Sequence, residues 1–250
     1  MRPVTTGTFG RLARRARPSR DGFRRALAPA LRRPIFRKPP LPGRELTRYR
    51  RRVAGVTVLG TGLLGASLST PPGSARFYGL TGATALTWTV GGLLAGPPTA
   101  SPPRRPVVVP VLTGLGAFGV FYGCALIVRR IPVLRGAIAG VLSYAERAPT
   151  PPVLLTALAA GAAEEVFFRG ALFAVAGERP VAVSSGVYVL STAVTRNPAL
   201  ILAAAVMGPL FAVQRGMTGG ILAPTLTHLT WSTLMIHYLP PLFPAAAERT

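Results

Sequence analysis

Beyond residue 52 the chain alternates between long apolar runs and short breaks of Pro, Gly or charged residues, a pattern typical of a multispanning helical membrane protein. A mixed segment, Ile131 to Tyr144, is predicted to lie in the membrane interface or to form a short extra helix. The predicted spans, several of them short, are Val53 to Ser69, Tyr78 to Ala95, Val107 to Val128, Val153 to Val175, Val181 to Val194, Pro198 to Val213 and Gly219 to Ile236. We therefore predict an all-α fold for residues 53–250, a polytopic transmembrane bundle of about seven to eight helices.

Composition supports a membrane protein and separates its N-terminal part from the rest. Hydrophobic residues make up 49% of the chain and charged residues only 14%, against about 25% in soluble domains. Of the 29 Lys and Arg, 17 lie in residues 1–52, with only two acids. This basic arm, residues 1–52, is predicted to be disordered or loosely helical.

The charge of the arm also predicts its side of the membrane and its partners. The cluster Arg48 to Arg52 directly precedes the first apolar run, so the positive-inside rule places the arm in the cytoplasm, where anionic headgroups attract it. Nucleic-acid binding is not expected, because only four aromatic residues accompany the 17 basic residues of the arm. Heavy use of Arg over Lys, with abundant Ala, Gly and Pro, suggests a GC-rich bacterial genome and hence a bacterial plasma membrane.

Three charges interrupt the apolar run from Pro151 to Ala176: Glu164, Glu165 and Arg169. Each costs on the order of 2.5 to 3.5 kcal/mol at the centre of a membrane helix, so they are expected to face other helices or a wet cavity. At about 100° per residue they share an arc of about 140°. Glu165 and Arg169 have the i, i+4 spacing of an ion pair. Glu164 has no local partner and adjoins a second carboxylate, a setting typical of a general base. The alternative is a charge network that only joins helices.

A second polar face lies in the last span, where Thr225, His228 and Ser232 recur at helical spacing. A histidine inside a bundle can polarise a carbonyl, take up a proton or bind a metal. A divalent metal such as zinc, held by Glu164 and His228, is one interpretation, although no H-E-x-x-H motif is present. A water activated by glutamate without a metal fits the same residues equally well.

Two of these motifs resemble the CPBP intramembrane proteases, which include the CAAX prenyl endopeptidases and bacterial proteins linked to bacteriocin processing and self-immunity. The resemblance covers about Pro151 to Tyr238. The family motif E-E-x-x-x-R-G is similar to Glu164 to Gly170, and the histidine helix entered through Gly and Pro is similar to Thr218 to His228. Alignment of the Ser-rich middle motif, F-x-x-x-H, puts Tyr188 at the aromatic position and Thr192 at the histidine. Ser232 replaces the asparagine of the last motif.

The resemblance implies roles for these positions. In the family the first glutamate activates water with help from the middle histidine, and the last histidine and asparagine stabilise the oxyanion. Glu164 would then be the base, with Arg169 orienting Glu165. His228 and Ser232 would form the oxyanion side, and Thr192 would stand in place of the middle histidine.

We therefore expect an intramembrane endopeptidase whose protease-like core spans residues 151–238. Its substrate would be a peptide or protein in or near the bilayer, and it would be cleaved by water that Glu164 activates. One alternative is an impaired, immunity-type relative that binds a peptide or a partner protein without cleaving it, as the substitutions Thr192 and Ser232 suggest. Another is a proton-coupled transporter that uses the buried carboxylates as a relay.

Overall fold

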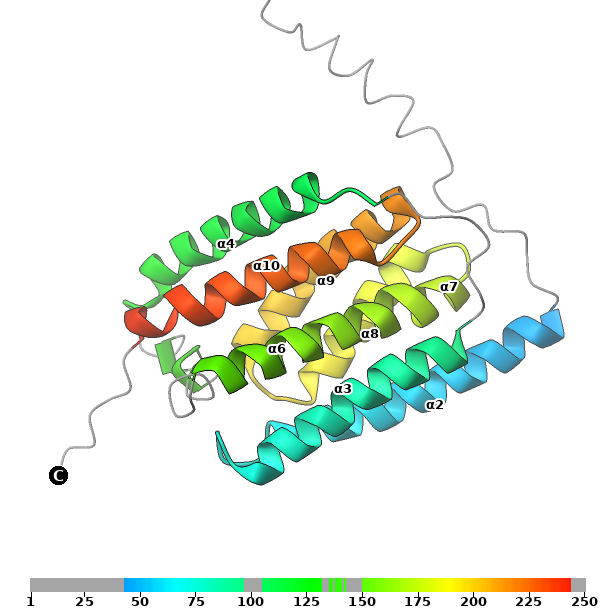
Figure 1. Cartoon of the computed structure of the whole chain (residues 1–250), viewed down its shortest axis with the longest axis horizontal. Helices are drawn as coiled ribbons and strands as arrows, with labels where there is room; N and C mark the ends of the chain where they lie inside the picture. The colour runs from blue at the N-terminus through cyan, green and yellow to red at the C-terminus, as the bar shows by residue number, and fades with distance from the viewer. Residues whose placement is uncertain are drawn as a thin grey trace, which may run out of the picture. The chain divides into compact units, whose positions relative to one another are not determined.

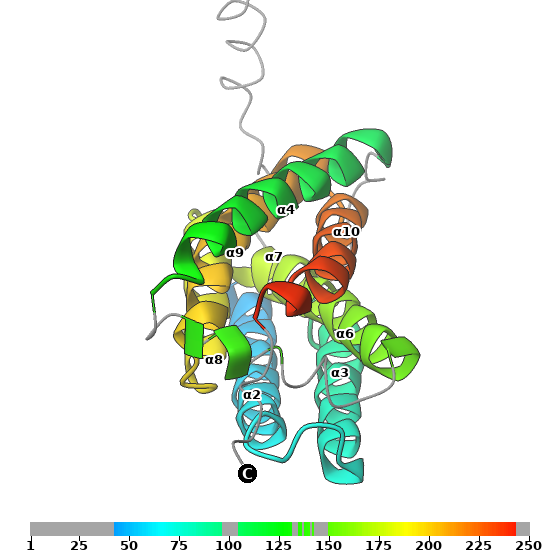
Figure 2. The same cartoon turned by 90° about the vertical axis from the view of Figure 1, so that its left-hand side faces the viewer.

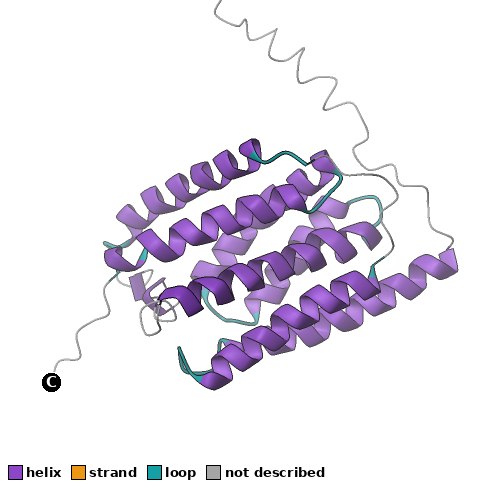
Figure 3. Cartoon of the chain, viewed as in Figure 1, coloured by secondary structure: helices purple, strands orange, loops and turns teal. Residues whose placement is uncertain are grey.

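The described part of the chain is helical throughout. The structure, a computed structural model, describes residues 43–96, 105–131, 135–136, 138–140, 142 and 150–243, and these contain no strand (Figure 1; Figure 3). The elements are α2 (Gly43–Ser67), α3 (Ala75–Ala95), α4 (Val108–Val128), α6 (Thr150–Glu164), the π-helix η1 (Glu165–Leu172), α7 (Phe173–Val175), α8 (Pro180–Ala193), α9 (Pro198–Thr218), α10 (Leu222–Tyr238) and the 3₁₀-helix η2 (Pro240–Leu242). The predicted all-α fold is confirmed.

Capping residues set the ends of several helices. The Ser74 hydroxyl accepts the N–H of Phe77 at the start of α3. Asn197 accepts two backbone N–H groups of α9 with its side-chain oxygen, and Pro198 occupies the first turn, where the missing N–H costs nothing. α9 ends at Gly219, whose φ of 72° is the left-handed conformation that glycine adopts without strain. These stops define the individual helices of the bundle.

Each predicted span overlaps a helix, and among the described helices three are both long and apolar enough to cross a bilayer. They are Val108–Val128, the continuous α6–η1–α7 segment Pro151–Val175, and Pro198–Thr218. The other spans lie in helices that are shorter or less apolar. α4 leaves Val108, Leu112 and Ile127 exposed, as expected for side chains that face lipid.

The first helix begins earlier than the sequence pattern indicated. The basic arm was predicted to extend to Arg52, but α2 starts at Gly43, so the last ten residues of the predicted arm are helical. The reason is an apolar face: Leu46 and Tyr49 pack against the buried cluster that contains Val53. Their i, i+3, i+7 spacing is the signal that the sequence analysis missed. Residues 1–42 lie outside the described residues.

The segment predicted as interfacial or as a short extra helix, Ile131 to Tyr144, is described only in part. Residues 135–136, 138–140 and 142 are helical. Leu142 is buried in a small cluster with Ala125 of α4 and with Leu239 and Phe243 after α10. This cluster joins the end of α4 to the C-terminal end of the described chain.

The α6–η1–α7 segment lies in the centre of the bundle, and close packing against α3 fixes its position. In both views α6 runs between α3 and α10 (Figure 1; Figure 2). Gly92 of α3 and Gly96, which caps the end of that helix, face η1, and a Cβ atom on Gly96 would lie only 2.8 Å from Cα of Ala171. Such small residues four apart allow two membrane helices to approach closely. Trp88 closes the contact by packing its ring on Phe167 and Phe168.

The histidine helix α10 is held from its other side by α4. Gly114 of α4 has no room for a side chain, because a Cβ atom there would lie 2.9 Å from the carbonyl oxygen of Thr227. The Thr227 hydroxyl donates to the carbonyl of Pro110 at 2.9 Å. These contacts fix the rotation of α10 about its own axis near His228. They thereby orient the histidine toward α6 and η1.

Candidate active site

The two glutamates stand where the central helix changes its winding. α6 ends at Glu164, and the next eight residues form the π-helix η1. The N–H of Phe173 donates to the carbonyl of Phe168, five residues back. The α-helical winding assumed for the charged motif is therefore wrong from Glu165 onward. Wide turns of this kind occur mostly as short insertions in α-helices, frequently at functional sites.

Side chains from two other helices stabilise this wide turn. Two carbonyl groups of η1, those of Phe168 and Arg169, accept hydrogen bonds from these side chains. Arg215 of α9 donates from Nε to the carbonyl of Arg169 at 2.7 Å. Ser184 of α8 donates to the carbonyl of Phe168 at 2.8 Å. The winding therefore depends on contacts that are distant in sequence.

Glu165 and Arg169 form an ion pair that is completely buried. Nη1 of Arg169 lies 3.2 Å from Oε1 of Glu165, and both side chains have 0% exposure. Nη2 of the same guanidinium donates to the carbonyl of Gly208 at 3.1 Å. The rings of Tyr188 and Phe211 flank the guanidinium, with centroids 4.5 and 5.1 Å from Cζ. The charge is thus paired, hydrogen-bonded and in contact with aromatic rings.

His228 binds the same carboxylate oxygen as the arginine. Its Nδ1 lies 2.9 Å from Oε1 of Glu165. Because a carboxylate only accepts, Nδ1 carries the proton of this bond. The imidazole stacks on Phe211 with a centroid distance of 4.7 Å. Its other nitrogen faces α6 at Gly161, where a Cβ atom would lie 3.2 Å from Nε2.

Glu164 has a different environment from Glu165. It is half-buried, whereas Glu165 is fully buried. The Tyr188 hydroxyl of α8 donates to Oε2 of Glu164 at 2.8 Å, while Oε1 accepts no hydrogen bond from the described residues. Glu164 also interacts electrostatically with His228, Glu165 and Arg169. The structure thus brings together four residues singled out in the sequence: Glu164, Glu165, Arg169 and His228.

The two remaining candidates are not joined to this group. The Thr192 hydroxyl donates to the carbonyl of Tyr188 in its own helix at 2.9 Å, so it does not bond to either glutamate. Ser232 lies one turn after His228 on α10 and is half-buried, and its hydroxyl forms no hydrogen bond with another described residue. Their roles as middle-motif and oxyanion residues stay predictions.

The donors in the site do not fit a tightly held zinc ion. Catalytic zinc usually takes three protein ligands, but no group of three His, Cys, Asp or Glu side chains suited to a metal occurs within residues 43–96, 105–131, 135–136, 138–140, 142 and 150–243. Nδ1 of His228 bonds to Glu165, which leaves Nε2 as the nitrogen that could bind a metal. Glu164 and His228 alone make an incomplete set, so no chemical step is derived through a metal.

Sequence reasoning missed two polar residues of the site. Tyr188 was assigned only to the aromatic position of the middle motif, yet it is the partner of Glu164. Arg215 was missed because the predicted sixth span stopped at Val213, whereas α9 continues to Thr218. A basic residue just beyond an apolar run was the available signal for Arg215. No pattern in the sequence indicated the contact of Tyr188.

Comparison with known families gives one match, over residues 146–234, to the family described as type II CAAX prenyl endopeptidase, Rce1-like. The match covers about a third of the chain and includes every candidate residue from Glu164 to Ser232. Comparisons with curated proteins and with solved structures find no match.

Proposed function

We propose that this chain is an intramembrane endopeptidase in which Glu164 activates the attacking water. Its similarity over residues 146–234 to the type II CAAX prenyl endopeptidases, together with three membrane-length apolar helices among the described residues, supports an integral membrane peptidase. The observation that carries the proposal is the contrast between the two carboxylates. Oε1 of Glu165 binds both Arg169 and His228. Glu164, by contrast, bonds to Tyr188 through Oε2 only, so its Oε1 is available.

The contacts of Glu165 support this division of roles. Its Oε1 binds both Nη1 of Arg169 and Nδ1 of His228, and the proposed reaction requires a second proton on His228 at Nε2. Glu165 then serves as the anion between the cations Arg169 and His228. Glu164 remains as the carboxylate free to take up a proton, and Nε2 of His228 has a proton to donate.

The proposed reaction is a hydrolysis in two steps. Oε1 of Glu164 takes a proton from water as the water oxygen bonds to the peptide carbonyl carbon. The Nε2–H of His228 donates to the oxyanion that forms. The C–N bond then breaks as Glu164 returns the proton to the amine nitrogen, which leaves a new carboxyl terminus and a free amine. Ser232, one turn from His228, is proposed to contribute a further hydroxyl donor.

The substrate is proposed to be a peptide or protein segment within or beside the bilayer. The test is to reconstitute the full chain in liposomes with a set of membrane peptides and to identify products by mass spectrometry in H₂¹⁸O. We expect one ¹⁸O atom in the new carboxyl terminus and no loss of rate after addition of EDTA. Absence of cleavage for every peptide would contradict the proposal, and a rate that EDTA abolishes and zinc restores would contradict the metal-free step.

A second candidate function is peptide binding without cleavage. The observation that favours it is Thr192, which stands at the motif position of the middle histidine but bonds within its own helix. A threonine hydroxyl cannot exchange a proton near neutral pH as imidazole does. Stable binding of a peptide that is never hydrolysed, in the same liposomes, would support this candidate over the peptidase.

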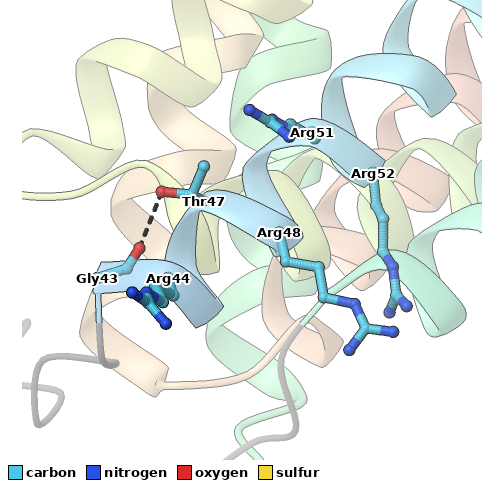
Figure 4. Close-up of a pocket in the computed structure, with 6 residues that line it drawn as sticks. All are labelled: Gly43, Arg44, Thr47, Arg48, Arg51 and Arg52. Carbon is cyan, nitrogen blue, oxygen red and sulfur yellow. Dashed lines mark hydrogen bonds between the residues drawn. The ribbon is translucent and has the colours of Figure 1, made fainter.

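We further propose that α2 contacts anionic headgroups on the cytoplasmic side of a bacterial plasma membrane. Its first three turns project Arg44, Arg48, Arg51 and Arg52 outward around one shallow hollow (Figure 4). Like charges at these spacings repel one another, and anionic lipid offsets the repulsion.

Replacement of these four arginines by Gln is expected to weaken binding of phosphatidylglycerol, roughly fivefold for each arginine, because each basic side chain near such a surface contributes about 1 kcal/mol. Native mass spectrometry of the full chain from nanodiscs of mixed phosphatidylglycerol and phosphatidylcholine measures the bound lipid. The variant with Lys at the same positions keeps the charge and should retain the lipid. Equal retention in the Gln variant would contradict the proposal.

A further inference from the structure

The carboxylate of Glu164 is held by a residue from another helix. Tyr188 of α8, 24 positions away in sequence, donates its hydroxyl to Oε2 of Glu164 at 2.8 Å. The geometry leaves Oε1 as the oxygen without a protein donor among the described residues. Tyr188 therefore decides which oxygen of the glutamate is available to a reactant.

The ring of Tyr188 is fixed by contacts on several sides. The guanidinium of Arg169 lies 4.5 Å from its centroid, and the ring of Phe168 packs edge-on at 5.0 Å. Gly208 of α9 gives the ring its space, since a Cβ atom there would lie 3.2 Å from Cδ1 of Tyr188. A ring held in this way delivers its hydroxyl to one place, which makes the bond to Glu164 part of the packed structure.

A phenol in this position acts differently from an imidazole. Its ordinary pKa is about 10, so it keeps its proton near neutral pH and always donates. A hydrogen bond to the ionised form of a carboxyl group favours that form. Tyr188 is thus suited to donate to the carboxylate of Glu164 and to orient it, and unsuited to accept a proton from it.

We propose that Tyr188 is the positioning residue of the base in this chain and that its hydroxyl does the orienting that the family pattern assigns to the middle histidine. The motif alignment placed the missing histidine at Thr192, one helical turn later, but the Thr192 hydroxyl is occupied by the carbonyl of Tyr188. The orienting group has moved one turn along α8. This inference rests on the proposed function for its catalytic meaning, while the bond itself is testable without a substrate.

The test uses Tyr188→Phe, which removes only the hydroxyl and keeps the ring against Arg169 and Phe168. The full chain in phosphatidylcholine liposomes is treated at pH 7 with dicyclohexylcarbodiimide, an apolar reagent that modifies protonated carboxyl groups within membranes. Peptide fragmentation distinguishes modification of Glu164 from that of Glu165. We expect modification of Glu164 to increase roughly tenfold in the variant, the ratio that follows from loss of one hydrogen bond to a charged group, with Glu165 unchanged.

Tyr238→Phe is the matched control. Tyr238 lies at the end of α10, and its ring contacts Phe118 and His237 rather than the carboxylates, so this variant should react as the wild type does. An unchanged reaction of Glu164 in Tyr188→Phe would overturn the inference. So would an equal rise at Glu164 and Glu165, because that result would reflect general loosening of the site.

Cleavage provides a second, separate measurement. With a cleaved peptide, Tyr188→Phe should lower kcat roughly tenfold to a hundredfold while KM stays near the wild-type value, because the hydroxyl acts on the base and not on the peptide. A rise in KM with kcat unchanged would overturn the positioning role. If no peptide is cleaved by the wild type, the proposed function fails, and the labelling result still decides whether Tyr188 controls Glu164.

Discussion

Glu164→Gln should abolish most peptide cleavage, with an expected fall in rate of roughly a hundredfold to ten-thousandfold, the usual contribution of a general base. An amide cannot take the proton from water, whereas its oxygen can still accept the hydrogen bond of Tyr188. The bundle should therefore remain folded. The measurement is the initial rate of product formation in liposomes, together with the unfolding temperature in detergent.

Glu178→Gln is a suitable control for the loss of one acid. Glu178 lies exposed in the turn between α7 and α8, so this variant should cleave at the wild-type rate. If Glu164→Gln cleaved as fast as Glu178→Gln, the proposed base would be wrong. If Glu164→Gln still bound the peptide without cleaving it, binding and chemistry would be separated as the mechanism requires.

Arg169→Ala should destabilise the folded bundle by about 3–5 kcal/mol, because it removes the permanently charged partner of the buried carboxylate of Glu165 and leaves only His228 beside it. The pair has no solvent exposure, so water cannot replace the guanidinium. The substitution also removes the hydrogen bond to Gly208 and the contacts with two aromatic rings. Unfolding in detergent, followed by circular dichroism, measures the loss.

A second variant identifies the cause of that loss. Glu165→Gln combined with Arg169→Met removes both charges, so it should be less destabilised than Arg169→Ala alone. Arg179→Ala, in an exposed turn, should have little effect. Equal destabilisation by the single and the double change would show that lost packing, rather than the unpaired carboxylate, accounts for the result.

The helices were predictable from the sequence because each depends on local signals. Apolar runs mark the spans, and the breaks between them, such as Asn197 followed by Pro198, mark where helices start or stop. The i, i+4 spacing of Glu165 and Arg169 likewise predicted a pair that the structure contains. Such features involve only neighbouring residues, so a linear pattern carries them.

The details of the site were less predictable because they arise from contacts between distant segments. The wide turn of η1 exposes carbonyls that Ser184 and Arg215 satisfy, and neither residue is a neighbour of the turn in sequence. The bond of Tyr188 to Glu164 likewise depends on how α8 packs on η1. A propensity for α-helix, summed over the charged motif, contains no information about these donors.

Oε1 of Glu165 contacts two partners, Arg169 and His228. The contact with Arg169 stabilises the fold, and the contact with His228 orients a residue of the proposed reaction. A relative without hydrolase activity would still be expected to retain Glu165 and Arg169, because loss of either residue would destabilise the bundle. Loss of Glu164 would destabilise the bundle less, because its hydrogen-bond partner is a neutral tyrosine. Among relatives of this chain, retention of Glu165 would therefore be explained by stability alone, whereas under the proposed mechanism loss of Glu164 would mark a relative that no longer hydrolyses peptides.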